Sequence, residues 1–202
     1  MLILSGGGDP EQVYPIDEYF AACIDKAKRV LYIPAAMERE VFTYEQCFDW
    51  FTSTYKPFGI QNIEMLTNLH NAEILTDTAA VFIGGGNTYK LLNELRESKF
   101  DQKLITYLDN GGTVYGGSAG AIIFGKTIET EIHTGSCNYG LTDLSGLNQL
   151  NGYDIWCHYT AKEEPLIAGY PRSLYILSEE SGLIVRNGEV NSIGEMYKKS
   201  VR

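Results

Sequence analysis

The sequence predicts an α/β fold: a mostly parallel sheet with helices on both faces and a short β-hairpin at the C-terminus. Up to about residue 125, short apolar runs alternate with segments whose apolar residues recur at helical spacing. Strands that alternate with helices through short loops form parallel sheets. Gly-rich loops at residues 6–8, 84–86 and 116–120 each follow a predicted strand. Because ligands bind at the carboxyl ends of parallel strands, these loops are expected to meet at one edge.

The individual elements follow from composition and periodicity. Strands are expected at residues 1–4, 30–33, 60–66, 79–83 and 113–115, and helices at residues 16–27, 43–54, 89–95 and 101–108. Later strands are expected at residues 127–134, 153–159, 174–177, 182–186 and 189–193. Asn187-Gly188 favours a tight hairpin turn between the last two. No repeat, low-complexity tract or linker divides the chain, so residues 1–202 are expected to form a single domain.

The overall composition restricts the class of partner. The chain has 202 residues, 44% of them hydrophobic, and a formal net charge of −10. This charge argues against nucleic acid and anionic membranes as partners. No apolar stretch approaches the roughly 18 residues of a membrane span, and the first residues lack the basic region of a signal peptide. The four cysteines show no CxxC spacing, so we expect reduced thiols, no zinc site and a cytoplasmic protein.

The stretch at residues 112–125 is the most informative. An apolar strand runs into Gly116-x-Ser118-x-Gly120, and an apolar segment typical of a helix follows. This is the pattern of a nucleophile elbow, in which a sharp strand-to-helix turn exposes a serine hydroxyl. Glycines flank the serine because a Cβ there would collide with the neighbouring backbone. A Gly-rich turn with an incidental serine is the alternative.

A serine nucleophile needs a general base, and the chain has only three histidines. His70 precedes the serine in a polar loop, whereas His133 and His158 follow it. His158 comes at the end of an apolar strand, where catalytic groups are usually mounted, although a structural histidine would fit there as well. Its neighbour Cys157 would point to the opposite face of that strand and is expected to be a core residue.

Taken together, Gly84-Gly85-Gly86-Asn87-Thr88, Gly117-Ser118-Ala119-Gly120 and the strand-end His158 closely resemble the dipeptidase E family of serine peptidases. This family includes aspartyl dipeptidases and the related cyanophycinases. The resemblance covers most of the chain and implies a fold like that of class I glutamine amidotransferases. It also implies Ser118 as nucleophile, His158 as general base, and the N–H groups of Gly86 and Ala119 as oxyanion hole. No metal or organic cofactor is implied.

The acid that would orient the histidine is not obvious, because His133 stands at or next to the position where the family carries an aspartate. Glu131 is one candidate, since residues 129, 131 and 133 would share one face of a strand at 127–134. Other nearby carboxylates are Glu129, Asp143 and Asp154. A Ser–His dyad without an acid is a further alternative.

An aspartyl dipeptidase needs a cation to pair with the substrate carboxylate. Arg172 is the first candidate for this substrate-binding role, with Arg39 and Lys162 as others. The leading hypothesis is a serine peptidase that hydrolyses short peptides, with Asp-X dipeptides among the candidates.

Two alternatives remain open: a catalytically weakened or silent peptide-binding protein on the same scaffold, and a cyanophycinase-like hydrolase. Amidotransferase activity is disfavoured because position 118 is serine rather than cysteine. The oligomeric state is left open, a homo-oligomer included.

Overall fold

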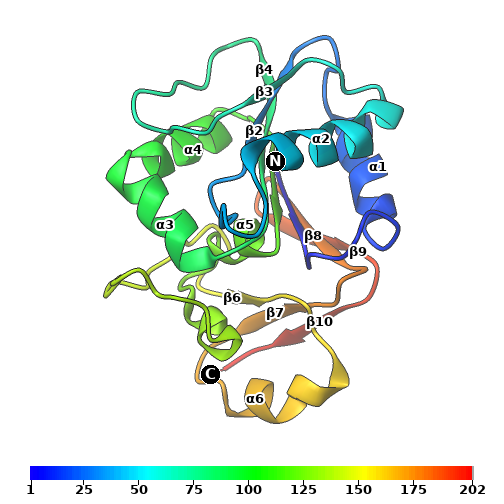
Figure 1. Ribbon diagram of the computed structural model, residues 1–202. Helices are drawn as coiled ribbons and strands as arrows, with labels where there is room; N and C mark the ends of the chain where they lie inside the picture. The colour runs from blue at the N-terminus through cyan, green and yellow to red at the C-terminus, as the bar shows by residue number, and fades with distance from the viewer. Residues whose placement is uncertain (202) are drawn as a thin grey trace.

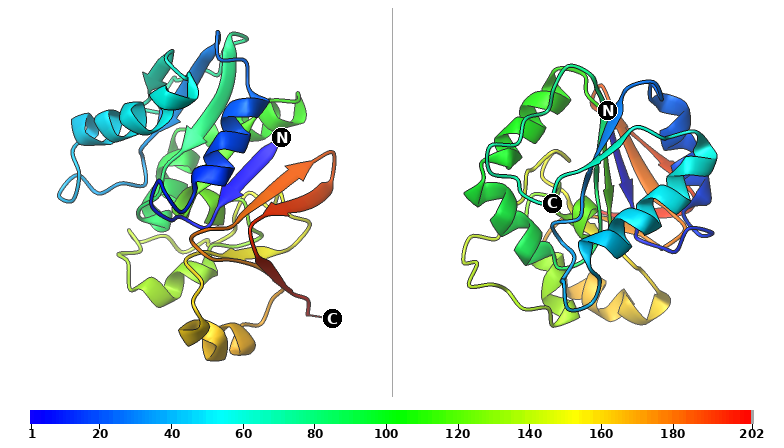
Figure 2. Two further views of the ribbon diagram at one scale, coloured as in Figure 1. Left: turned by 90° about the vertical axis from the view of Figure 1, so that its right-hand side faces the viewer. Right: turned by 45° about the horizontal axis from the view of Figure 1, so that its top comes forward.

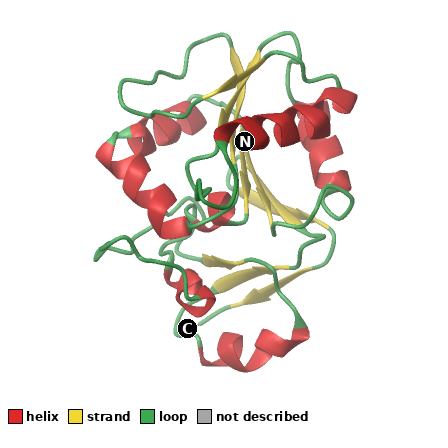
Figure 3. Ribbon diagram, in the orientation of Figure 1, coloured by secondary structure: helices red, strands yellow, loops and turns green. Residues whose placement is uncertain are grey.

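The computed structural model describes residues 1–201, and within them the chain forms two β-sheets with helices around the larger one (Figures 1 and 3). The large sheet has seven strands in this described part, in the order β3-β2-β4-β5-β1-β8-β9. Its parallel strands are β1 (Leu2–Ser5), β2 (Arg29–Ile33), β3 (Ile63–Met65), β4 (Thr78–Ile83) and β5 (Val114–Gly117).

The two remaining strands of this sheet form the predicted hairpin. They are β8 (Gly182–Arg186) and β9 (Glu189–Ile193), which pair antiparallel, and β8 also runs antiparallel to β1. Asn187 and Gly188 both have positive φ, which a two-residue turn of this kind requires. The prediction of a mostly parallel sheet with a C-terminal hairpin is therefore confirmed.

Helices cover both faces of the large sheet, as the alternation of strands and helices predicts (Figures 1 and 2). Helices α1 (Tyr14–Cys23) and α2 (Tyr44–Tyr55) lie on one face. Helices α3 (Thr88–Glu97), α4 (Phe100–Asp109) and the short α5 (Ala119–Ile122) lie on the other. Among the helices of residues 1–201, none combines the length and the apolarity needed to cross a bilayer.

The two faces are packed through alternate residues of the central strands. Val81 and Ile83 of β4 enter the core under α3 and α4, whereas Ala80 and Phe82 enter the core under α1 and α2. Successive residues of a strand point to opposite faces, so a strand buried on both sides must be apolar throughout. This explains why the central strands appear in the sequence as continuous apolar runs.

A second, three-stranded sheet lies beside the large one, below it in Figure 3. It contains β6 (Asp154–Trp156), β7 (Leu174–Leu177) and β10 (Met196–Lys199), with β6 and β7 parallel. A 3₁₀ turn at Ala161–Glu163 and helix α6 (Glu164–Gly169) connect β6 to β7. Parallel pairing places the residues that follow β6 and those that follow β7 at the same edge of this sheet.

The prediction of a strand at residues 127–134 is wrong. Glu129–Thr134 forms a 3₁₀ helix, after a single isolated bridge between Thr127 and Ser145. The buried side chains include Ile128 and Glu131, three residues apart, and the Glu131 N–H donates to the Ile128 carbonyl. This spacing is that of one 3₁₀ turn rather than of a strand face. Another 3₁₀ turn, Lys56–Phe58, follows α2.

Candidate active site

The three Gly-rich loops meet at the carboxyl ends of the adjacent strands β4, β5 and β1, with Ser118 at their centre. Ser118 joins β5 to α5 with φ 51° and ψ −112°, a backbone conformation that residues other than glycine rarely adopt. Its N–H donates to the Ser5 carbonyl of β1 over 3.1 Å. A conformation of this kind costs roughly 1–3 kcal/mol and persists only where the surroundings enforce it. The packing of three strand ends around Ser118 provides that enforcement.

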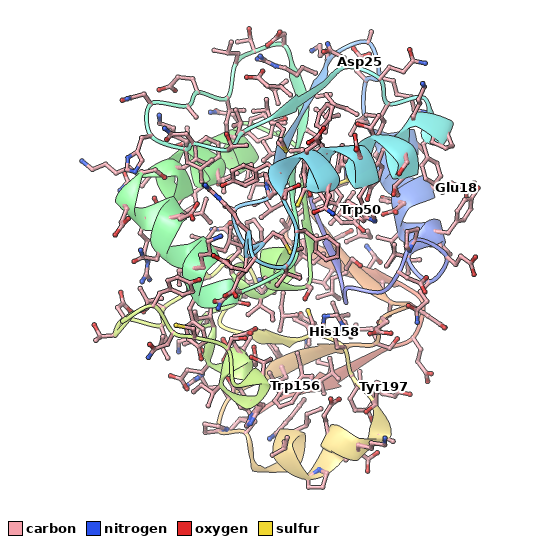
Figure 4. All side chains as sticks on the ribbon, viewed as in Figure 1. Glu18, Asp25, Trp50, Trp156, His158 and Tyr197 are labelled. Atoms are coloured by element: carbon pink, nitrogen blue, oxygen red, sulfur yellow. The ribbon has the colours of Figure 1, made fainter. Side chains whose placement is uncertain are left out.

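His158 comes to Ser118 from the small sheet. The Nε2 atom of His158 lies 2.8 Å from Ser118 Oγ, which is hydrogen-bond distance. Two residues after β6, His158 also has positive φ, at 54°, and its N–H donates to the Gly6 carbonyl. In Figure 4 its side chain lies between the large sheet and the small one. Of the three histidines, His158 is the one in contact with Ser118.

The carboxylate that contacts His158 belongs to Glu179, which is not among the acids proposed from the sequence. Its Oε1 lies 3.1 Å from His158 Nδ1, and its Oε2 accepts a hydrogen bond from Gln12 Nε2 at 3.0 Å. These two hydrogen bonds lower the pKa of the Glu179 carboxyl below its usual value. Glu179 is the second residue after β7, the parallel neighbour of β6, and this position at a strand end is the signal that could have identified it.

Glu131 does not contact His158. Its carboxylate is buried and accepts hydrogen bonds from the hydroxyls of Thr88 (2.7 Å), Thr134 (2.7 Å) and Ser136 (2.9 Å). Because the segment turns into a 3₁₀ helix, the common strand face expected for residues 129, 131 and 133 does not exist. Glu129 and Asp154, two other acids proposed from the sequence, contact Arg172 instead.

Arg172 lies in a separate ionic cluster rather than at Ser118. Its Nε donates to Asp154 Oδ2 at 2.7 Å, and its Nη2 donates to Thr127 Oγ1, Glu129 Oε2 and the Tyr170 hydroxyl. Asp154 is fully buried, so this guanidinium neutralises a buried charge at the start of β6. The guanidinium lines neither of the pockets described below, and the structure does not bring it together with Ser118.

Several backbone N–H groups around Ser118 have no hydrogen-bond acceptor in the described chain, and those of Gly86 and Ala119 are among them. Gly86 has φ 135°, and a Cβ there would lie 2.4 Å from the Ala36 carbonyl oxygen. Glycine is therefore required at this position. Ala119 begins α5, where the first N–H groups of a helix have no partner within the helix. Ala119 is the next residue to Ser118 in the chain, and Gly86 lines a pocket together with Ser118.

Ser118 lines two pockets. The first, of about 310 Å³, lies under α2 and is lined largely by aromatic side chains. The second, of about 320 Å³, has His158, Glu131, His133 and Glu163 among its lining residues. No lysine or arginine of the described chain lines either pocket. Ser118 is the residue that lines both pockets.

Cys157 behaves as a core residue, as expected from its strand position. Its side chain is buried, and burial raises the pKa of its thiol. The Sγ atom points at the carbonyl oxygens of Ser5 and Ser118 rather than at the neighbouring imidazole. A thiol with a raised pKa holds little thiolate at neutral pH, so Cys157 is a poor nucleophile.

The family match and the curated relatives identify this protein as a serine-type peptidase. Residues 1–194 match the model of peptidase family S51, and the chain belongs to that family. It is 24% identical to Peptidase E of Haemophilus influenzae over 184 residues, which covers 84% of this chain and 82% of that protein. Peptidase E of Actinobacillus pleuropneumoniae serotype 5b is 29% identical over 110 residues, 52% of this chain and 44% of that protein.

Two solved structures share the fold over nearly the whole chain. A peptidase E-like protein from Listeria monocytogenes EGD-e superposes with a TM-score of 0.74 at 22% identity, covering 100% of this chain and 98% of that one. A peptidase from an acI-B1 Actinobacterium gives a TM-score of 0.72 at 16% identity, with coverage of 98% and 93%. At these identities the superpositions establish the α/β architecture.

Proposed function

We propose that this chain hydrolyses a peptide bond of short peptides with a Ser118–His158–Glu179 triad. The observation that carries the proposal is the continuous line of hydrogen bonds from Ser118 Oγ through the two ring nitrogens of His158 to Glu179. A serine hydroxyl alone is a weak nucleophile, and an adjacent base held by an acid is the arrangement that activates it.

In this mechanism Ser118 Oγ attacks the scissile carbonyl carbon while His158 Nε2 takes the hydroxyl proton. Glu179 holds the proton on Nδ1, so that Nε2 is free to accept, and stabilises the imidazolium that forms. The same Nε2 then gives its proton to the leaving amine. A water molecule, activated by His158 in turn, releases the acyl group from Ser118.

The oxyanion of the tetrahedral intermediate would be held by the N–H groups of Gly86 and Ala119. Preorganised donors of this kind are typically worth a factor of about 10² to 10³ in turnover. Support comes from the absence of any competing acceptor within residues 1–201 and from the steric need for glycine at position 86.

The alternative of a catalytically silent peptide-binding protein arises because the sequence does not identify the acid of the triad. Glu179 supplies a carboxylate at hydrogen-bond distance from His158, which removes that motive. An aspartyl specificity has no comparable support, because no lysine or arginine of the described chain lines either pocket to pair with an aspartate side chain.

The test is labelling with a fluorophosphonate probe together with hydrolysis of a dipeptide panel. The wild-type protein is expected to be labelled on Ser118 and to turn over at least one dipeptide. Ser118→Ala should lose both properties, whereas Ser192→Ala, an exposed serine of β9, should keep both. A folded wild-type protein that is neither labelled nor active would refute the proposal.

A further inference from the structure

The pocket under α2 is lined mainly by apolar and aromatic groups. Five of its lining side chains are aromatic residues from β2, β4, β5 and α2: Tyr32, Phe82, Tyr115, Trp50 and Tyr55. No charged side chain of residues 1–201 lines it. Within this lining the rings of Phe82 and Tyr115 stack, with centroids 4.4 Å apart. Ser118 lies at its rim, so whatever fills the pocket lies next to the bond that Ser118 would attack.

Most of the polar groups in this lining are occupied elsewhere. The hydroxyls of Tyr55 and Tyr115 both donate to the buried Asp17 Oδ1, at 2.9 and 2.8 Å. The Ser5 hydroxyl accepts the Gly7 N–H, and the Gln46 side-chain oxygen accepts the N–H of Thr43 in the capping box of α2. The pocket therefore presents mainly carbon, and a polar ligand group would lose its hydration without a replacement partner.

The mouth of the pocket exposes apolar surface to water. Phe42 and Trp50 line the pocket and keep 48% and 42% of their surface exposed, although most large apolar side chains of the chain are buried. Neighbouring exposed aromatic groups beside a cavity are typical of binding sites, because a ligand that covers them removes this surface from water.

We propose that this pocket binds a large apolar or aromatic side chain of the substrate, on the residue next to the scissile bond. The inference rests on the proposed peptidase function, whose site it shares, and it names the substrate class. The volume of about 310 Å³ is at the lower end for ligand pockets, which suits one side chain better than a whole ligand. An ionised aspartate would have to enter without a counter-charge, which is strongly unfavourable.

The first experiment compares kcat/KM for dipeptides that carry Phe, Leu, Ala or Asp on either side of the scissile bond. We expect a preference for Phe or Leu over Ala of about 100-fold or more on one side, because each methylene in an apolar pocket contributes roughly 10-fold or more. Asp at that position should be cleaved more slowly than Ala. A preference for Asp, or equal rates for all four side chains, would overturn the inference while leaving the peptidase function intact.

Variants of the wall test whether this pocket is the origin of the preference. Gly84 lines the pocket, and a Cβ there would make ordinary contact, 3.5 Å from the Tyr32 ring, so Gly84→Val should narrow the pocket without a backbone clash. Trp50→Ala removes part of the mouth at a half-exposed position. Both should lower the Phe-to-Ala ratio of kcat/KM by about 10-fold. Tyr14 is a similarly exposed aromatic residue outside the pocket, and Tyr14→Ala should leave that ratio unchanged. A ratio unaffected by both wall variants would refute the assignment.

A binding measurement separates this inference from the failure of catalysis. Ser118→Ala is titrated with Phe- and Asp-containing dipeptides, with tryptophan fluorescence as the readout, since Trp50 lies at the mouth. Tighter binding of the Phe peptide, by about 10-fold, supports the pocket assignment even if the wild-type protein proves inactive. Equal binding, or tighter binding of the Asp peptide, contradicts it.

Discussion

The Nδ1 atom of His158 lies 3.1 Å from Oε1 of Glu179, and both residues follow parallel neighbouring strands of the small sheet. The imidazole and its acid are thus presented together from one sheet edge. Ser118 is presented to them from the edge of the other sheet. The geometry of the candidate triad therefore depends on how the two sheets are held against each other.

Replacement of Glu179 tests its role directly. Glu179→Gln keeps the shape of the side chain but removes the charge that holds the proton on His158 Nδ1. We expect turnover to fall by about 10³ to 10⁴-fold, with little change in KM. Glu180→Gln changes the adjacent exposed acid and should have no effect on turnover. Steady-state kinetics on the preferred dipeptide provide the measurement, and an active Glu179→Gln protein would exclude Glu179 from the triad.

Gly7 is predicted to be a positioning residue for the Ser118–His158 pair. A Cβ at Gly7 would lie 2.6 Å from Ser118 Cβ and 2.7 Å from His158 Cε1, so Gly7→Ala must push the two side chains apart. A displacement of about 1 Å is enough to reduce turnover by about 10²-fold.

The control for this prediction is Gly152→Ala. Gly152 also has positive φ, at 85°, but a Cβ there would meet nothing within 4 Å. Both variants carry backbone strain, yet we expect only Gly7→Ala to lose activity and fluorophosphonate labelling. Equal activity of the two alanine variants would contradict the prediction.

Asp17 is expected to make the stability depend on pH. Burial raises the pKa of its carboxyl to about 6 in the folded protein, from an ordinary value of 3.8. The folded state therefore binds the proton more tightly than the unfolded state, and stability falls as pH rises from about 4 to about 6. Above this window Asp17 lowers the free energy of unfolding by a constant amount, roughly 2 to 3 kcal/mol.

Asp17→Asn keeps the oxygen that accepts the hydroxyls of Tyr55 and Tyr115. We expect this variant to be more stable than the wild type at pH 7.5 and to lose this part of the pH dependence. Urea denaturation at pH 4, 5, 6 and 7.5 measures the effect. A wild type and variant whose stabilities differ equally at every pH would disprove it.

Arg172 is predicted to act on stability and not on substrate choice. Arg172→Ala would leave the fully buried Asp154 with only hydrogen-bonded partners, which typically costs about 3 kcal/mol or more. The relative kcat/KM of Asp- and Phe-containing dipeptides should stay unchanged. Arg172→Lys, which keeps the charge, should recover part of the lost stability. A selective loss of Asp-peptide cleavage would instead assign Arg172 to the substrate.

Local signals in the sequence account for most of the fold and for half of the candidate site. Apolar runs such as residues 79–83 identify the central strands, because burial on both faces leaves no polar position. The elbow pattern indicates Ser118, and the strand-end position indicates His158. Both signals lie within a few residues of the side chain concerned, which is why they can be read from the sequence.

The parts that the sequence does not predict depend on long-range contacts. Glu179 stands beside Glu180 after a short strand, and only the parallel pairing of β6 with β7 distinguishes it from a solvated acid. Apolar and polar residues alternate at positions 127–134 as in a strand. In the structure the Glu131 carboxylate accepts hydrogen bonds from hydroxyls that include that of the distant Thr88, and residues 129–134 form a 3₁₀ helix. The aromatic pocket collects side chains from four elements, so no single stretch of sequence reveals it.

The division of the candidate triad between the two sheets has a consequence for biosynthesis. A ribosome completes the strand and loop that carry Ser118 some forty residues before it reaches His158, and Glu179 emerges later still. On the proposed mechanism, a nascent chain therefore exposes a serine without its base throughout this interval. Proteolytic capacity would arise only when the last strands dock, so an interrupted translation product should be inert toward other polypeptides.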